Sequence, residues 1–274
     1  MRIIQISDTH LSAEFSHFAA NAETIGRHVA ASGADLVINT GDLSMNGAVS
    51  PADLALAAGW HRSLGVPVKA VPGNHDVGDR VEIRADQPLD DARLETFRRV
   101  IGPDRWVEDI PGWRLIGLNA MLFATGHRED EEQIDWLADV ARVDAKVALF
   151  LHKPLCIDTL DEGPRGYWTV VPERRRPLLA ALGQSDLRLV ASGHLHIAKH
   201  RTIGGIEHIW SPAGSFVCGD MQEDLGGDRR IGWVEYEFSP DGFTHRFVFP
   251  EDARDLPLDP LHDLIYPPFA AEDA

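Results

Sequence analysis

Residues 1–10 read Met1-Arg2-Ile3-Ile4-Gln5-Ile6-Ser7-Asp8-Thr9-His10, a short apolar run that ends in polar residues. The run is typical of a buried strand rather than of a signal peptide. Further short runs rich in Val and Ile follow along the chain, with segments of helical periodicity between them. This alternation predicts an α/β fold in which strands cross over helices into a layered sheet.

The pattern places strands and helices at definite positions. We expect core strands at residues 2–7, 36–40, 68–71, 115–118, 146–151 and 187–191. We expect helices near residues 18–31, 52–64, 90–100, 131–140 and 173–182.

After residue 196 the alternation gives way to hairpin signals. Gly204-Gly205 and Pro240-Asp241-Gly242 each separate two short runs that alternate in the manner of strands. The second half of the chain is therefore expected to add an antiparallel sheet.

No repeat or low-complexity linker divides the chain, so we expect one domain over residues 1–250 and a Pro-rich tail over residues 251–274. The tail contains Leu256-Pro257-Leu258 and Tyr266-Pro267-Pro268-Phe269, which do not suit regular structure. Its interleaved apolar residues predict packing on the tail's own domain. The alternative is packing on a partner subunit of a homo-oligomer.

Composition limits the partners of this 274-residue chain. Lys and Arg number 26 against 43 Asp and Glu, and the net charge of -17 argues against nucleic-acid polymers and anionic membrane surfaces as partners. No apolar run approaches the roughly 18 residues of a transmembrane segment. Only two cysteines occur, Cys156 and Cys218, and this sparing use predicts free thiols and a cytoplasmic location.

Five strand-to-loop junctions carry residues that can bind a metal. Because ligands of an open α/β sheet lie at the carboxyl ends of its strands, we expect these residues to form one site. The candidate ligands are Asp8, His10, Asp42, Asn74, His152, His194 and His196. Seven ligands exceed the needs of one tetrahedral ion, but they suit two divalent ions if one carboxylate bridges. Mixed nitrogen and oxygen donors are compatible with Mn, Fe, Co or Zn, and the sequence leaves that choice open.

Some of these residues also have ordinary structural explanations. Asp42 after a glycine is compatible with a turn or a helix cap, and Asn74 with a left-handed turn position. His152 is marked only by Leu151-His152-Lys153-Pro154, so a structural histidine is its alternative. The joint occurrence of all five junctions favours the metal site.

Five segments resemble, in the same order along the chain, the motifs of the calcineurin-like metallophosphoesterases. They are Asp8-x-His10, Gly41-Asp42, Gly73-Asn74-His75-Asp76, His152 and Gly193-His194-x-His196. The resemblance covers about residues 1–215. It implies a four-layer αββα sandwich of two mixed sheets flanked by helices.

The resemblance also implies a role for each motif residue and a cofactor of two divalent or mixed-valence metal ions. The first ion would be held by Asp8, His10 and His196. The second would be held by Asn74, His152 and His194. Asp42 would bridge the two, and His75 would be the catalytic residue that contacts the phosphate or protonates the leaving oxygen.

Departures from the family narrow the expected activity. Gly41-Asp42-Leu43-Ser44-Met45-Asn46 lacks the Asp-Arg-Gly continuation of the serine/threonine protein phosphatases, and the acidic chain argues against a nuclease. We expect a metal-dependent phosphodiesterase acting on a cyclic nucleotide, a glycerophosphodiester or, like a phospholipase C, a phospholipid headgroup. The alternative is a noncatalytic scaffold on the same fold.

The loop after His152 is expected to form a substrate rim. Tyr167 and Trp168 in this loop are candidates to stack on a nucleobase, or to enclose a quaternary ammonium with Asp161 or Glu162 nearby. The alternative is a loop anchored by two buried aromatic side chains.

Overall fold

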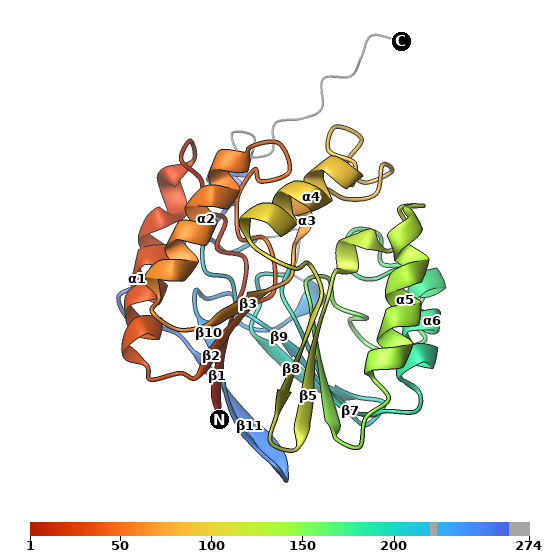
Figure 1. The fold of residues 1–274 in the computed structure, drawn as a ribbon. Helices are drawn as coiled ribbons and strands as arrows, with labels where there is room; N and C mark the ends of the chain where they lie inside the picture. Colours follow the sequence, from red (N-terminus) through yellow and green to blue (C-terminus); the bar gives the residue numbers. More distant parts are fainter. Residues whose placement is uncertain (220–223, 263–274) are drawn as a thin grey trace, which may run out of the picture.

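The computed structural model describes residues 1–219 and 224–262, and it has four layers (Figure 1). Two β-sheets lie at the centre, and helices cover the outer face of each. On one side lie α1 (Ala19–Ala31) and α2 (Pro51–Ser63), and on the other α5 (Arg128–Val140) and α6 (Pro172–Leu182). The predicted αββα sandwich of two mixed sheets is confirmed.

The first sheet has the strand order β11-β10-β1-β2-β3. Its parallel strands are β1 (Arg2–Ile6), β2 (Leu36–Asn39) and β3 (Val68–Ala70). The hairpin of β10 (Trp233–Ser239) and β11 (Gly242–Val248) joins the edge of β1 in antiparallel direction.

The second sheet has the strand order β4-β5-β6-β7-β9-β8. Four strands run parallel: β5 (Trp113–Leu118), β6 (Lys146–Leu151), β7 (Asp186–Ser192) and β9 (Ile206–Trp210). The antiparallel edges are β4 (Trp106–Ile110) and β8 (Lys199–Ile203).

The expectation of an additional antiparallel sheet is wrong. Both hairpins form, but β9 extends the second sheet beside β7 and β10 extends the first sheet beside β1. The reason is burial, since Ile209 of β9 and Val234 and Tyr236 of β10 belong to the apolar core between the two sheets. A separate sheet would have needed a second core.

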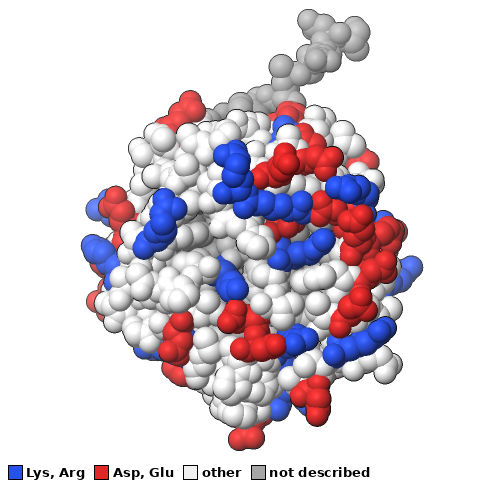
Figure 2. All heavy atoms as spheres, viewed as in Figure 1, with Lys and Arg blue, Asp and Glu red and all other residues white. Residues whose placement is uncertain are grey.

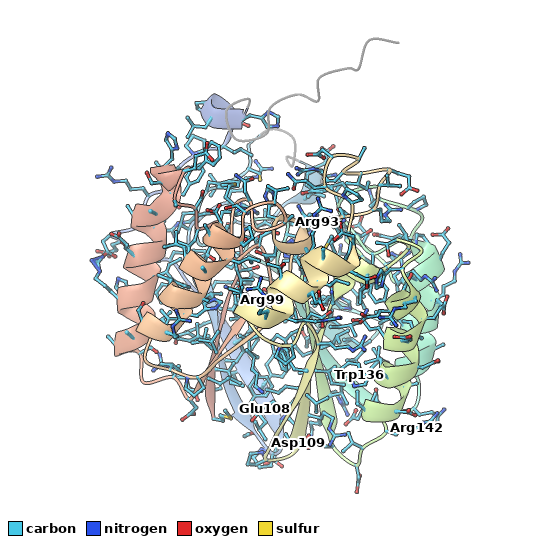
Figure 3. All side chains as sticks on the ribbon, turned by 45° about the horizontal axis from the view of Figure 1, so that its top comes forward. Arg93, Arg99, Glu108, Asp109, Trp136 and Arg142 are labelled. Atoms are coloured by element: carbon cyan, nitrogen blue, oxygen red, sulfur yellow. The ribbon has the colours of Figure 1, made fainter. Side chains whose placement is uncertain are left out.

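Strand β4 was not predicted. Its central residues Glu108 and Asp109, labelled in Figure 3, interrupt the apolar pattern. Charged residues are common on edge strands because they oppose pairing with another chain. Trp106 anchors the strand, since its indole N–H donates to the Ala70 carbonyl at 2.8 Å.

The apolar core holds the two sheets in fixed register. It is built from both sheets and includes Ile3, Ile38, Val71, Leu115, Phe150 and Leu189. Because β1, β2, β5 and β6 are buried on both faces over most of their length, their sequences are largely apolar runs. The core therefore fixes where the carboxyl ends of these strands lie.

Helix α4 (Asp91–Val100) contacts the loop that precedes it through Arg93, which is labelled with Arg99 in Figure 3. Arg93 donates to the carbonyl oxygens of Ala48 and Pro88 at 2.9 and 2.7 Å. Arg98 pairs with Asp104 and with Glu129 of α5. The Arg93 contacts join Pro88 to Ala48 in the loop that follows β2, and the Arg98 contacts join α4 to α5.

The described part of the C-terminal segment packs on the same chain. The Val217 N–H donates to the Leu256 carbonyl, the Leu258 N–H donates to the Val217 carbonyl, and Leu258 is buried. Residues 263–274 of the predicted tail lie outside the described residues, so the division at residue 250 stays a prediction.

Two sequence expectations concern the chain as a whole. Cys156 and Cys218 are buried and free, which confirms the expectation of free thiols. Within residues 1–219 and 224–262, no helix has the length and apolar character needed to cross a membrane. The cytoplasmic location stays a prediction.

Candidate metal centre

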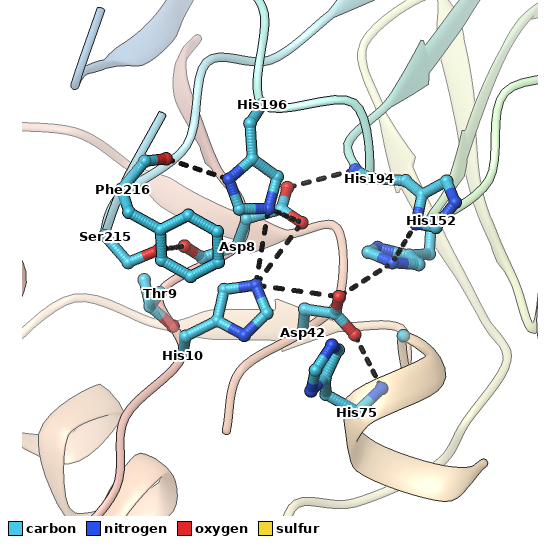
Figure 4. Close-up of polar contacts among 12 residues, drawn as sticks. Asp8, Thr9, His10, Asp42, His75, His152, His194, His196, Ser215 and Phe216 are labelled. Atoms are coloured by element: carbon cyan, nitrogen blue, oxygen red, sulfur yellow. Dashed lines mark hydrogen bonds and ion pairs between the residues drawn. The ribbon is translucent and has the colours of Figure 1, made fainter. Parts of the chain in front are cut away.

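The carboxyl ends of five strands bring the predicted ligands together (Figure 4). They follow β1, β2, β3, β6 and β7, and all are buried: Asp8, His10, Asp42, Asn74, His152, His194 and His196. Asn74 and His75 open the short helix α3 (Asn74–Val77) directly after β3. Residues almost 190 positions apart in sequence thus share one buried site.

The first group of possible ligands consists of Asp8, His10 and His196. The Asp8 Oδ1 atom lies 3.2 Å from His196 Nε2 and 4.0 Å from His10 Nε2. The two Nε2 atoms are 3.3 Å apart. These three side chains therefore present one ligand atom each toward a common point.

The second group consists of Asn74, His152 and His194. His152 Nε2 lies 3.3 Å from Asn74 Oδ1 and 3.2 Å from His194 Nδ1. Two nitrogens and one oxygen again point to a common position.

Asp42 lies between the two groups. Its Oδ2 atom is 3.7 Å from His10 Nε2 and 3.3 Å from His152 Nε2. Its Oδ1 atom is held by the backbone N–H of His75 at 2.9 Å. Asp8 is arranged in the same way, because its Oδ2 accepts the His194 N–H at 3.0 Å and leaves Oδ1 to face the histidines.

Backbone carbonyls fix which nitrogen of each imidazole faces the site. His152 Nδ1 and His196 Nδ1 each lie 2.8 Å from a carbonyl, of Thr40 and Phe216, and His194 Nε2 lies 3.0 Å from that of Tyr167. A ring nitrogen at this distance from a carbonyl carries the proton, so the opposite nitrogen presents a lone pair to the site. Metal-binding histidines are commonly oriented by such hydrogen bonds.

The side chains fit a pair of cations. In each group two imidazole nitrogens lie 3.2 to 3.3 Å apart, close enough to be ligands of one cation. Asp8 Oδ1 is buried and makes no hydrogen bond within the described part of the chain. A metal ion would bind the nitrogens of each group and would satisfy this oxygen.

Burial and the Asp42 carboxylate shift the pKa values of the histidines at the site. Burial lowers the pKa of His10 and of His194 well below the ordinary value, so both rings are neutral. Burial also opposes charging of His152, but the Asp42 carboxylate outweighs it and raises the pKa of His152 to about 9. Without a metal, a protonated His152 therefore compensates the buried Asp42 charge, a role that a bound cation would take over.

Backbone strain is concentrated at these residues. Five of them have a positive φ of 42° to 69°: Asp8, His10, Asp42, His194 and His196. Ala124 is the other non-glycine residue of this kind in the described ranges. Such conformations cost on the order of 1 kcal/mol or more each and occur preferentially at functional sites.

Two motif glycines permit the close approach of these loops. A Cβ atom on Gly73 would lie 2.1 Å from Asp42 Oδ1, and one on Gly193 would lie 1.9 Å from Ser7 Oγ. Any larger residue at either position would displace a carboxylate ligand or the strand end that carries it.

Asp76 supports the site, a role that the sequence did not assign although the residue belongs to a motif. Its carboxylate accepts the backbone N–H groups of Leu43, Ser44 and Gly73 at 2.9 to 3.1 Å, and it also accepts the Ser44 hydroxyl. Burial raises the pKa of Asp76 to about 7. Asp76 therefore ties the loop that carries Asp42 to the helix that carries Asn74.

A cavity of about 440 Å³ opens beside the two groups. It is lined by Asp42, His75, His194, His196 and by Glu82, Ile83, Arg84, Tyr167, Trp168, Phe216, Cys218, Leu258 and His262. The lining residues outside the motifs, apart from Tyr167 and Trp168, were not predicted, since single apolar or charged residues in distant loops carry no signal of their own.

The loop after His152 borders this cavity. Tyr167 and Trp168 are half-buried and line the cavity, and Trp168 also packs against Ile157 and Leu195. Glu162 is not among the lining residues, and its carboxylate accepts the N–H groups of Ile157 and Asp158. Glu162 is thus occupied within its own loop.

Comparisons with known proteins agree with this geometry. The model of the calcineurin-like phosphoesterase family matches residues 1–198. A Synechococcus protein named a probable cyclic nucleotide phosphodiesterase is 29% identical over 259 residues, or 88% of this chain and 89% of its own. An Arcobacter nitrofigilis protein named a probable glycerophosphodiester phosphodiesterase is 27% identical over 72% of each chain. A dimetal phosphatase from Danio rerio has the same fold, with a TM-score of 0.62 and 14% identity over 93% of this chain and 98% of that one.

Proposed function

The chain belongs to the calcineurin-like phosphoesterase family, as its motifs predicted, and on this premise we propose that it is a metal-dependent phosphodiesterase of small substrates. The observation that carries the proposal is the position of Asp42 Oδ2, within 3.3 to 3.7 Å of a histidine in each group. One carboxylate oxygen that faces two groups is the arrangement that a dinuclear centre requires. The family uses a dinuclear metal centre.

We assign the ligands by the groups that they form. Asp8, His10 and His196 would hold one ion, Asn74, His152 and His194 the other, and Asp42 both. When bound, the two ions would polarise the phosphoryl oxygens and supply a hydroxide nucleophile. The nitrogen and oxygen donors suit Mn, Fe, Zn or Co.

His75 is proposed to act on the substrate. Its Nδ1 lies 2.6 Å from the Met45 carbonyl and therefore carries a proton, and the ring lines the cavity. Burial lowers the pKa of His75 in the absence of substrate. A phosphodiester anion in the cavity would favour the protonated ring, so that Nε2–H would bind the phosphate or protonate the leaving oxygen.

The cavity supports a substrate with an apolar or aromatic part. Trp168, Phe216 and Leu258 provide apolar walls, and Arg84 contributes a positive charge. Asp161 and Glu162, the two carboxylates considered beside a choline group, are both absent from the cavity lining, and Glu162 binds backbone N–H groups of its own loop. These contacts support a cyclic nucleotide over a phospholipid headgroup, and a glycerophosphodiester is the next candidate.

The surface charge supports a small substrate over a nucleic-acid polymer. On the face in Figure 2, Lys and Arg side chains are interleaved with Asp and Glu side chains. The net charge of -17 adds a repulsion that a polymer of phosphates would experience along its whole length.

Metal analysis together with a diester assay tests the proposal. We expect two ions per chain, hydrolysis of bis(p-nitrophenyl) phosphate that a chelator abolishes, and slower hydrolysis of the monoester. Screening cyclic nucleotides, glycerophosphodiesters and phospholipids would then rank the substrates. A protein that binds no metal and hydrolyses none of these esters would instead be the noncatalytic scaffold.

Trp168→Ala should reduce activity selectively. Loss of one stacking or cation–π contact costs about 1 to 2 kcal/mol, so we expect kcat/KM for the natural substrate to fall about 5- to 30-fold. Hydrolysis of a small chromogenic diester and metal content should change little. Trp168→Phe is the matched control, because it keeps an aromatic face. A parallel loss on all substrates together with a lower melting temperature would show that Trp168 is only an anchor of its loop.

A further inference from the structure

Tyr167 contacts two possible ligands of the second ion. The Asn74 Nδ2–H group donates to the Tyr167 hydroxyl oxygen at 3.1 Å. The His194 Nε2–H group donates to the Tyr167 backbone carbonyl at 3.0 Å, and the two rings are 4.5 Å apart. The residue expected to contact substrate therefore also adjoins the centre.

The hydroxyl contact orients the Asn74 amide. Because Nδ2 is directed at the phenol oxygen, Oδ1 is directed the opposite way and lies 3.3 Å from His152 Nε2. An amide turned by 180° would present N–H groups, which bind no cation. In this orientation the contact holds Nδ2 at the phenol and leaves Oδ1, the atom of Asn74 that can act as a ligand, on the side of His152.

The carbonyl contact acts on His194 in a similar manner. Since Nε2 carries the proton, Nδ1 presents its lone pair toward His152 at 3.2 Å. Two of the three residues in the second group are therefore oriented by Tyr167.

Tyr167 is itself held firmly. The Lys153 ammonium lies 5.1 Å from the centre of its ring, at a distance that permits a cation–π contact. Lys153 is buried and pairs with buried Asp79 at 2.6 Å. This ion pair fixes the ring from the side of residues 78–90.

We propose that Tyr167 is a positioning residue for the second ion, acting through Asn74 and His194. The inference rests on the proposed function, which supplies the ions. The first group is oriented by other contacts, such as that between His196 Nδ1 and the Phe216 carbonyl at 2.8 Å. Loss of the Tyr167 hydroxyl should therefore lower the affinity for the second ion and leave the affinity for the first unchanged.

Tyr167→Phe tests this asymmetry, because it removes the hydroxyl and keeps the ring and the carbonyl. The chelator-treated full-length protein would be titrated with Mn²⁺ in a calorimeter. The Mn²⁺ affinity of one site should fall about 10- to 100-fold, the usual effect of losing a residue that orients a metal ligand. The other site should be unchanged.

Tyr236→Phe is the matched control. It removes another buried tyrosine hydroxyl, which donates to Gln5 Oε1 at 2.7 Å, and it should lower the melting temperature without changing either affinity. Two unchanged sites in Tyr167→Phe would overturn the positioning role, as would equal weakening of both sites together with a lower melting temperature. A wild-type protein that binds no Mn²⁺ would instead count against the proposed function.

Discussion

Asp42→Ala is expected to abolish hydrolysis and to remove metal from both positions. Asp42 Oδ2 faces His10 and His152, so its loss takes a ligand from each group. It also removes the negative charge that screens the repulsion between two cations. We expect turnover to fall by more than about 10³-fold, beyond the usual cost of losing one electrostatic contact in a transition state. Metal content by mass spectrometry and turnover would be measured on the same sample.

A matched control separates this effect from a general loss of buried charge. Asp53 is buried like Asp42, but it lies on α2 outside both ligand groups, and its carboxylate accepts a 3.3 Å hydrogen bond from the Ala13 N–H. Asp53→Ala should keep both ions and most of the activity. If Asp42→Ala retained two ions per chain at the wild-type rate, the bridging assignment would be wrong.

The sequence predicted the convergence of the ligands because that convergence has a simple physical basis. Asp8 and Asp42 follow apolar strands of the first sheet and His152 follows one of the second, and the carboxyl ends of both sets of parallel strands meet at the site. The αββα sandwich was implied by the resemblance of the motifs to the calcineurin-like family. Local sequence and the strand topology carry this information together.

The sequence did not show which edges the later strands join. Hairpin signals such as Gly204-Gly205 predict a turn but not a neighbour, and the neighbour depends on apolar contacts between distant residues such as Ile209 and Ile3. Strand β4 was missed for a related reason, since its acidic residues conceal the apolar pattern.

The cavity walls were harder to predict than the ligands. Phe216 and Leu258 have no chemical signature, and they reach the cavity only because Val217 pairs with residues 256–258. Glu162, in contrast, has a suitable charge for a choline group, but its carboxylate is bound to backbone N–H groups of its own loop. Charge in a loop sequence therefore says little about the direction of a side chain.

His75→Ala is expected to lower turnover while both ions stay bound. The backbone N–H of His75, not its side chain, donates to Asp42 Oδ1, so the substitution leaves the bridging carboxylate in place. Loss of a general acid lowers turnover by roughly 10²- to 10⁴-fold. Calorimetric titration with Mn²⁺ and turnover on a series of diesters would be measured for the same variant.

The series of leaving groups distinguishes the two roles proposed for His75. An acid matters most when the leaving oxygen is basic, so the defect should be large for alkyl diesters and small for nitrophenyl diesters. An equal defect across the series would favour positioning of the phosphate instead. His75→Asn offers a second comparison, because a shorter side chain with an N–H group can still bind phosphate but cannot donate a proton at neutral pH. Recovery by His75→Asn on nitrophenyl diesters alone would assign proton transfer to the imidazole, whereas loss of either ion in His75→Ala would place His75 among the ligands and contradict the assignment.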